Sequence, residues 1–208
     1  MREKSLWQVQ TERNPGHSQW YIQRFKTMAE QGNDIWGEAR LIDALSPREA
    51  KILDAGCGPG RIGAYLHERG HRVTGIDIDP QLIAEATRVC PDAQWVTADL
   101  TDLREALGYA ADATLGDEGF ETIVCAGNVM TFLAPSTRAA VLENFAAVLT
   151  DTGRAVIGFG AGRGYDFEEF FADAAAAGLQ VQQRFATWEM HPFTQDSTFL
   201  VAFLTRAS

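Results

Sequence analysis

The segment 52–61, with the sequence Ile-Leu-Asp-Ala-Gly-Cys-Gly-Pro-Gly-Arg, constrains the fold more than any other part of this chain. Its apolar start predicts a short buried strand, and its glycines predict a tight turn that opens a helix. Glycine permits positive φ and lets a ligand approach the main chain closely. The first turn of the helix would present free N–H groups to that ligand. The segment therefore predicts a strand, a turn that binds a nucleotide-like ligand, and a helix.

From residue 51 onward, predicted strands alternate with predicted helices. We expect strands at 51–54, 72–77, 94–98, 121–126 and 154–159, and helices at 61–69, 80–89, 102–109, 136–149 and 167–177. This alternation is typical of βαβ units. Two final strands, 180–187 and 198–205, are joined by a loop alone, so we expect them to pair antiparallel. The predicted fold class is α/β, a doubly wound, seven-stranded, mainly parallel sheet with a reversed C-terminal strand.

The residues before the first strand predict helices. Segment 1–16 lacks clear periodicity and ends in an Asn-Pro-Gly turn signal. A helix is expected at 17–31 with Ser18 as its cap, and a second helix at 35–45. At 208 residues the chain is expected to form one domain, 1–208. We expect it to comprise a helical lid, 1–46, and an α/β core, 50–208.

The charge and composition exclude several classes of partner. The formal net charge of −10 argues against nucleic acid or an anionic membrane as the main partner, because phosphate binding depends on Lys and Arg. No segment is apolar over the roughly 20 residues that a membrane span requires. The three cysteines form no CxxC pair and are expected to be reduced. We therefore expect a soluble, cytoplasmic protein without nucleic-acid or membrane partners.

Ligands of doubly wound sheets bind at the carboxyl ends of the parallel strands. In this chain that edge would gather segments 54–60, 77–79, 99–100, 126–128 and 160–165. Because the last strand is reversed, the connection 188–197 should reach the same edge.

The spacing of the glycines distinguishes between classes of nucleotide-like ligand. A nicotinamide-binding fingerprint reads G-x-G-x-x-G, but the third glycine here comes one position early and Arg61 stands where that fingerprint requires Gly. A P-loop is excluded because no Gly-Lys-Ser/Thr follows. Taken alone, the glycines are also compatible with tight packing between a strand and a helix.

Two carboxylates at strand ends narrow the ligand further. Asp77 ends the second strand, roughly 20 residues past the glycines, where an acidic residue suits the hydroxyls of a ribose. Asp99 follows the third strand and suits the exocyclic amine of a base such as adenine. Asp79 precedes Pro80 and is expected to cap a helix. Solvated carboxylates at strand ends are the alternative for Asp77 and Asp99.

Together these motifs resemble those of class I S-adenosylmethionine-dependent methyltransferases of the small-molecule type. The resemblance covers about residues 50–160, and the reversed strand fits the Rossmann-like fold of that family. It implies S-adenosylmethionine as the cofactor. The glycines would lie against the methionine part of the cofactor. Asp54 would help to hold the turn and the amino group of the cofactor, and Asp77 would bind its ribose. The cofactor-binding residues that it implies are Asp54, Gly56, Cys57, Gly58, Gly60, Asp77, Ile78, Asp99, Leu100 and Ala126.

Missing motifs narrow the acceptor. No Asn/Asp-Pro-Pro-Tyr/Phe sequence follows the fourth strand, and Cys125 lies within that strand and not in a Pro-Cys loop. The first absence argues against amino-methylation of DNA bases by enzymes that carry that motif, and the second argues against a cytosine-C5 methyltransferase. Metal-dependent members of the family carry acidic residues where this chain has Ala126-Gly127 and Gly160-Ala161, so we expect no catalytic metal. The expected acceptor is a small molecule that is methylated on oxygen or nitrogen.

Few residues are candidates for the acceptor side. His191 and His17 are candidate general bases, although a solvated or capping histidine is the commoner situation. His67 and His71 are expected on the surface. Arg163 and Tyr165 would suit an anionic acceptor or belong to a mobile polar loop. The expected wall of the acceptor cavity is made of Trp20, Tyr21, Arg24 and Trp188, although aromatic residues at helical spacing also fit a core.

Two other functions stay open from the sequence. One is a catalytically silent S-adenosylmethionine-binding interaction module. The other is a nucleotide-dependent oxidoreductase, which the glycine spacing and the terminal strand pair disfavour.

Overall fold

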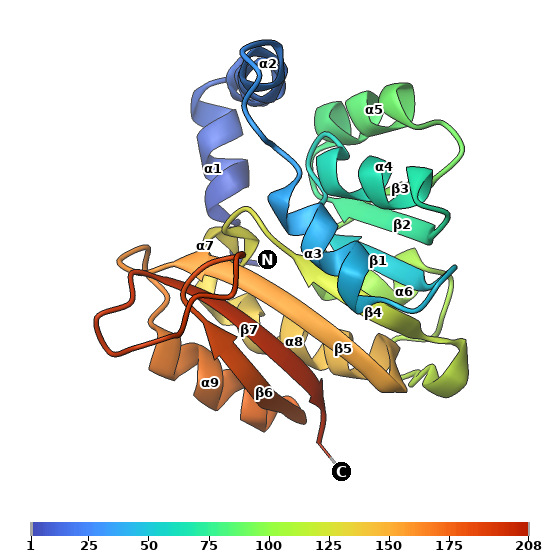
Figure 1. Cartoon of the computed structure of the whole chain (residues 1–208), viewed down its shortest axis with the longest axis vertical. Coiled ribbons are helices and arrows are strands. Elements are labelled where there is room, and N and C mark those ends of the chain that lie inside the picture. The colour runs from blue at the N-terminus through green and yellow to red at the C-terminus, as the bar shows by residue number, and fades with distance from the viewer. Residues whose placement is uncertain (1, 208) are drawn as a thin grey trace.

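A computed structural model describes residues 2–207, which form a central sheet with helices on both faces (Figure 1). Over these residues the sheet has seven strands in the order β3-β2-β1-β4-β5-β7-β6. The strands are β1 Lys51–Ala55, β2 Arg72–Asp77, β3 Gln94–Thr97, β4 Phe120–Cys125, β5 Leu149–Gly160, β6 Leu179–Phe185 and β7 Phe199–Arg206. The β1–β5 strands pair in parallel, and β7 runs antiparallel to both β5 and β6. The predicted fold class, including the reversed strand, is confirmed.

Two apolar clusters, one on each face of the sheet, hold the helices in place. One cluster lies under α6, α8 and α9, and the other lies under α3 and α4. The helices are α1 Leu6–Arg13, α2 His17–Glu30, α3 Gly37–Leu45, α4 Arg61–Glu68, α5 Pro80–Val89, α6 Leu103–Ala106, α7 Val129–Phe132, α8 Arg138–Val148 and α9 Phe167–Ala176, with short 3-10 turns η1 Leu100–Asp102, η2 Gly116–Glu118 and η3 Pro135–Thr137. None of these helices is long and apolar enough to cross a membrane.

Trp95 of β3 fills a groove that glycines leave open. A Cβ atom built on Gly75 would lie 2.2 Å from its Cζ3 atom, and one built on Gly63 would lie 2.8 Å from its Cη2 atom. The indole Nε1 donates a hydrogen bond of 2.7 Å to the carbonyl of Cys90. Trp95 thereby joins β3 to β2, to α4 and to the end of α5.

The N-terminal region differs from the expectation. Segment 1–16, expected to lack regular structure, contains α1, which begins with a capping box: Ser5 Oγ accepts from the Gln8 N–H, and Gln8 Oε1 accepts from the Ser5 N–H. Ser18 does not cap α2, whose N-cap is Gly16. Its hydroxyl is buried and donates to Asp79, a partner far along the chain.

Other differences arise from contacts that are distant in sequence. His71 was expected on the surface, but it is only 2% exposed, and its Nε2 lies 3.0 Å from Asp43 Oδ1 on α3. β5 starts at Leu149 and not at residue 154 as expected, and it shifts its register against β4. A short helix, α7, follows β4 where no helix was expected.

Candidate active site

The turn after β1 depends on glycine. Gly56 has φ +76° and Gly58 has φ +54°, values that side-chain-bearing residues rarely adopt. The N–H groups of Gly56 and Cys57 both donate to the carbonyl of Ile76, at 2.8 and 3.0 Å. A Cβ atom on Gly56 would lie 2.3 Å from Val129 Cγ2, so the turn also leaves no space there for a side chain. The end of β2 and the start of α7 thus fix the turn from two sides.

Asp77 is held in one orientation by the main chain. Its Oδ2 accepts from the Gly58 N–H and its Oδ1 accepts from the Asp79 N–H, both at 2.9 Å. Burial raises the pKa of Asp77 to about 6, although these hydrogen bonds act in the opposite direction. The carboxylate is therefore tied to the glycine turn at the place where β2 ends.

Asp54 and Asp99 also have local partners. Asp54 Oδ2 accepts from the Gly63 N–H at 2.9 Å, which joins the end of β1 to the first turn of α4. Burial raises the pKa of Asp54 to about 7. Asp99 Oδ1 accepts from the N–H and the hydroxyl of Thr101 and so caps η1. The Asp54 carboxylate thus joins β1 to α4 across the glycine turn.

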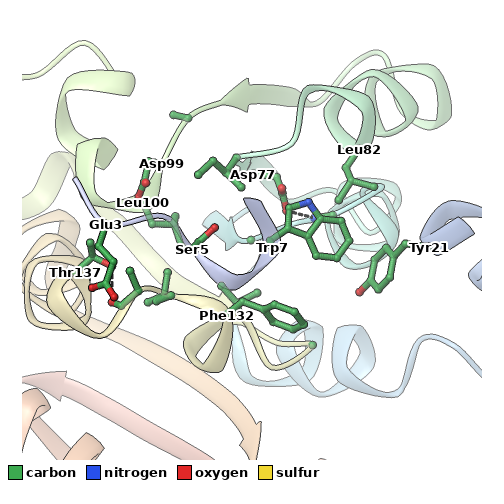
Figure 2. A pocket seen from close by; sticks show the side chains of 18 residues that line it. Glu3, Ser5, Trp7, Tyr21, Asp77, Leu82, Asp99, Leu100, Phe132 and Thr137 are labelled. Atoms are coloured by element: carbon green, nitrogen blue, oxygen red, sulfur yellow. Dashed lines mark hydrogen bonds between the residues drawn. The ribbon is translucent and has the colours of Figure 1, made fainter. Parts of the chain in front are cut away.

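One cavity gathers the ends of the first three strands (Figure 2). Its walls enclose about 750 Å³ of empty space, counted together with the open solvent at its mouth. Of the residues implied to bind cofactor, it is lined by Gly56, Gly58, Asp77, Ile78, Asp99 and Leu100. Sequence reasoning missed other lining residues that come from the N-terminal segment, α5 and α7, which are Glu3, Ser5, Trp7, Leu82, Val129 and Phe132.

A smaller cavity lies on the other side of the glycine turn. It shares Tyr21, Gly56, Gly58 and Gly127 with the first cavity, so the two adjoin across these residues. Three more of the implied cofactor residues line it, namely Asp54, Cys57 and Ala126. Gly60 lines neither cavity. It is the N-cap of α4, and a Cβ atom there would lie 2.8 Å from the Cβ atom of Ala86.

The N-terminal segment is bound across the larger cavity. Arg2 donates two hydrogen bonds to Asp102, at 2.6 and 2.7 Å, and Glu3 accepts from the Ser136 hydroxyl at 2.6 Å. Further along, Asp79 accepts from the indole of Trp7 at 2.8 Å, from Ser18, and from the Gln81 N–H at 2.8 Å. Asp79 caps α5 as predicted, and it also anchors α1 and α2.

The chain is similar to known methyltransferases in sequence and in structure. Residues 52–153 match a family model described as a methyltransferase domain. A TehB-like SAM-dependent methyltransferase from Corynebacterium glutamicum is 50% identical, over 93% of this chain and 100% of that one, with a TM-score of 0.84. The chain belongs to the S-adenosylmethionine-dependent methyltransferases. S-adenosylmethionine is accordingly its cofactor.

Two curated relatives match over shorter stretches. YqeM of Bacillus subtilis, which carries a methyltransferase name, is 30% identical over 121 residues, 58% of this chain and 44% of the relative. The trans-aconitate 2-methyltransferase of Escherichia coli is 51% identical over 51 residues, 24% of this chain and 20% of the relative. The matched region thus spans less than half the length of either relative.

The cavity of this methyltransferase fits the cofactor of its family. A Cβ atom on Gly58 would have only Tyr21 Cε1 near it, at 3.6 Å, so the space above this glycine is open to a ligand. The Asp77 and Asp99 carboxylates line the same cavity. Hydrogen-bond acceptors beside an open stretch of main chain suit a ligand that carries ribose hydroxyls and an amine. Among residues 2–207 no group of three His, Cys, Asp or Glu side chains is placed to hold a metal ion.

The structure brings one residue of the expected acceptor wall, Tyr21, to the two cavities. Trp20 is 55% exposed and stacks on His17, with ring centroids 5.4 Å apart. Arg24 is exposed and lies 6.0 Å from the centroid of the Trp20 ring. None of these three neighbours lines either of the two cavities at the glycine turn. Tyr21 therefore connects α2 with the cofactor residues, and Phe25 of the same helix also lines the smaller cavity.

No described residue of the connection 186–198 lines either of these cavities. Trp188 covers Gly158 of β5, where a Cβ atom would lie 2.4 Å from its Cζ2 atom. His191 is exposed, and its carbonyl accepts from the Ala186 N–H at 2.8 Å. After β5, the Tyr165 side chain is fully buried and its hydroxyl donates to Asp173. The aromatic residues of this region thus contact the core of the fold.

Proposed function

We propose that this methyltransferase transfers a methyl group from S-adenosylmethionine to an oxygen or nitrogen atom of a small molecule. The observation that carries the proposal is the single cavity that joins the glycine turn after β1, Asp77 after β2 and Asp99 after β3. The bound cofactor supplies a methyl group on a cationic sulfur, which is a good leaving group. The protein then has to supply alignment, proximity and exclusion of water.

The two cavities divide the proposed cofactor contacts. In the larger one, Asp77 would bind the ribose, and Ile78, Asp99 and Leu100 would contact the adenine. The residues of the glycine turn and of the smaller cavity would hold the methionine part: Asp54, Gly56, Cys57, Gly58 and Ala126. Gly60 would act indirectly, by letting α4 start close to α5.

We assign the helical segment 1–46 the role of a lid over this site. Glu3, Ser5, Trp7 and Tyr21 line the larger cavity, and the bonds of Arg2, Glu3 and Trp7 fasten the segment to the core. A lid of this kind would exclude water during transfer. It would also have to move when the cofactor is exchanged.

The acceptor is proposed to bind beside Tyr21. The other residues expected in its wall, Trp20, Arg24 and Trp188, line neither cavity at the glycine turn and would contact only an acceptor that extends beyond them. His17 and His191 stay the proposed general bases. His17 has the better position, because its ring centroid lies 4.9 Å from that of Trp7, which lines the cavity. Single-turnover rates of His17→Gln and His191→Gln across pH would test both, since losing a base lowers the rate and removes its pH dependence.

Isothermal titration calorimetry with S-adenosylmethionine, S-adenosylhomocysteine and NAD tests the proposal. We expect both adenosyl compounds to bind and NAD not to bind. Tight binding of NAD in place of the adenosyl compounds would overturn the proposal in favour of an oxidoreductase. Transfer of a labelled methyl group to a panel of small acceptors then tests catalysis. Binding without transfer to any acceptor would favour the silent interaction module.

A further inference from the structure

Asn128 joins the carboxyl ends of β4 and β5. It has φ +67°, a left-handed conformation that non-glycine residues rarely adopt. Its side-chain Oδ1 accepts a hydrogen bond of 2.8 Å from the Gly160 N–H, and its carbonyl accepts from the Thr131 N–H at 2.9 Å. Because the first bond uses the oxygen of the amide, the nitrogen Nδ2 is the end that is left to donate. Among residues 2–207 this donor has no hydrogen-bond partner.

A second donor comes from the loop after β5. Arg163 is exposed and lies between Gly162 and Gly164, which have φ of +69° and +80°. Its side chain folds back over the end of the strand. A Cβ atom built on Gly160 would lie 3.2 Å from Arg163 Nε and 3.6 Å from Asn128 Oδ1. The Arg163 guanidinium and the Asn128 amide are therefore neighbours above Gly160.

Contacts on both sides of Arg163 hold the loop against the core. The Ala161 N–H donates to the Thr198 carbonyl at 2.9 Å, which fastens the start of the loop to β7. Arg138 of α8 is only 5% exposed and donates to the Gly164 carbonyl at 2.5 Å, which fastens its end. The fold thus fixes the two ends of the short segment that carries Arg163.

The charge of Arg163 is not neutralised within the described part of the chain. Arg138 pairs with Glu169 at 3.1 Å, whereas no carboxylate of residues 2–207 forms an ion pair with Arg163. A guanidinium presents N–H groups in a planar fork that matches the two oxygens of a carboxylate. A side-chain amide beside it adds a further N–H. The two side chains together suit a carboxylate ligand.

This pair of donors lies beside the place where methyl transfer would occur. Gly127, which precedes Asn128, lines both cavities at the glycine turn, and a Cβ atom on it would lie 3.8 Å from Tyr21 Oη. The sulfonium lies between the ribose and the methionine part of the cofactor, so it would be held where the two cavities adjoin. Neither Asn128 nor Arg163 lines these cavities, which leaves both side chains to a second molecule.

We propose that Asn128 and Arg163 form a subsite for a carboxylate of the methyl acceptor, and that the acceptor is a small carboxylic acid. The Asn128 Nδ2 and the Arg163 guanidinium both donate to the carboxylate. The bound carboxylate anchors the acceptor beside Gly127, where its oxygen or nitrogen nucleophile meets the methyl group. The inference rests on the proposed function, since it names the class of acceptor for the same site.

Matched pairs of an acid and its amide test the subsite on the intact protein. The probes are para-hydroxybenzoate with para-hydroxybenzamide, and para-aminobenzoate with para-aminobenzamide. Each is titrated by NMR into protein saturated with S-adenosylhomocysteine, whose binding also shows that each variant is folded. The variants are Arg163→Gln, Arg163→Lys and Asn128→Asp, which keeps an oxygen for the Gly160 N–H and removes the donor. Arg154→Gln is the matched control, because it removes the same charge roughly 20 Å back along β5.

We expect the wild type to bind each acid about 5- to 30-fold more tightly than its amide. Arg163→Gln and Asn128→Asp should abolish this preference by weakening the acids alone. Arg163→Lys should keep part of it, because the charge stays and the fork is lost. Arg154→Gln should leave it unchanged. A wild type that binds neither acid or does not prefer the acids, or an equal loss in Arg154→Gln, would overturn the inference.

Transfer of a labelled methyl group separates the inference from the proposed function. Transfer to small acids, with a loss of rate in Arg163→Gln, is the expected result. Transfer to neutral small molecules alone would overturn the inference and leave the proposed function intact. Transfer to a protein or a nucleic acid, and to no small molecule, would overturn the proposed function itself.

Discussion

The indole Nε1 of Trp7 donates a hydrogen bond of 2.8 Å to Asp79 Oδ2, which joins α1 to the residue that caps α5. The other carboxylate oxygen accepts from the Gln81 N–H, and Ser18 donates to the same oxygen as Trp7. The Asp79 N–H in turn donates to Asp77. One buried carboxylate thus connects the N-terminal segment, a core helix and the proposed ribose ligand.

Replacing Asp79 should loosen both the core and the N-terminal segment. We expect Asp79→Ala to lower the free energy of unfolding by about 2–4 kcal/mol, because it removes a helix cap and leaves buried donors without acceptors. Ser18→Ala removes one bond to the carboxylate and keeps the cap, so its cost should be about 1 kcal/mol. Denaturant unfolding measures both. Hydrogen exchange in α1 and α2 should rise in both variants, and unchanged exchange there would contradict the anchoring role.

Asp54 should make stability depend on pH. Its folded-state pKa of about 7 lies above the ordinary aspartate pKa of 3.8, so the folded protein holds this proton more tightly than the unfolded chain. The resulting stabilisation is complete below pH 4 and is lost as pH rises through about 7. Asp77, with a pKa of about 6, acts in the same direction.

We therefore expect the effect of Asp54→Asn on the free energy of unfolding to be about 2–4 kcal/mol more favourable at pH 8 than at pH 4. The asparagine oxygen can still accept from the Gly63 N–H, so the packing should survive. Denaturant unfolding of both proteins at pH 4 and pH 8 gives the four values needed. An equal effect at both pH values would rule out this titration.

The two glycines at the turn should respond differently to alanine. Gly56→Ala places a Cβ atom 2.3 Å from Val129 Cγ2 at a positive φ, and we expect a loss of stability of about 2–4 kcal/mol. Gly58→Ala meets only Tyr21 Cε1 at 3.6 Å, so its cost should be about 1–2 kcal/mol, from the backbone alone. Its new methyl group points into the proposed cofactor space. Thermal unfolding and calorimetry should show the larger stability loss for Gly56→Ala, and at least about a tenfold loss of affinity in a folded Gly58→Ala protein.

Release of the product should depend on Arg2. The Arg2–Asp102 pair joins the N-terminal segment to η1, and both side chains are partly exposed. Exposed pairs contribute about 0–1 kcal/mol, so Arg2→Ala should speed dissociation of S-adenosylhomocysteine by up to about fivefold in stopped-flow fluorescence. Lys4→Ala is the matched control. Its partner Glu12 lies on α1, so that pair does not fasten the segment to the core. Equal rates in both variants would argue against a lid held by Arg2.

The sheet and the strand-end residues could be predicted because their signals are local. Alternation of strands and helices gives the topology, and the topology places Asp77 and Asp99 at one edge. Trp7 and Phe132 carried no such signal, because their place in the cavity depends on how α1 and α7 pack on other elements. The start of α1 was readable in the Ser5-x-x-Gln8 capping box. The burial of His71 depends on Asp43, 28 residues away, and no local pattern gives it.

The packing of Trp95 couples positions that are far apart in the sequence. Its indole occupies the volume that side chains at Gly63 and Gly75 would need. Alanine at position 75 alone should overpack this groove, and a smaller residue at position 95 alone should leave a void. When the two substitutions are made together, the volume added at position 75 should compensate for the volume removed at position 95, and the two losses of stability should offset each other. The residue types at these two positions are therefore expected to covary among relatives of this chain.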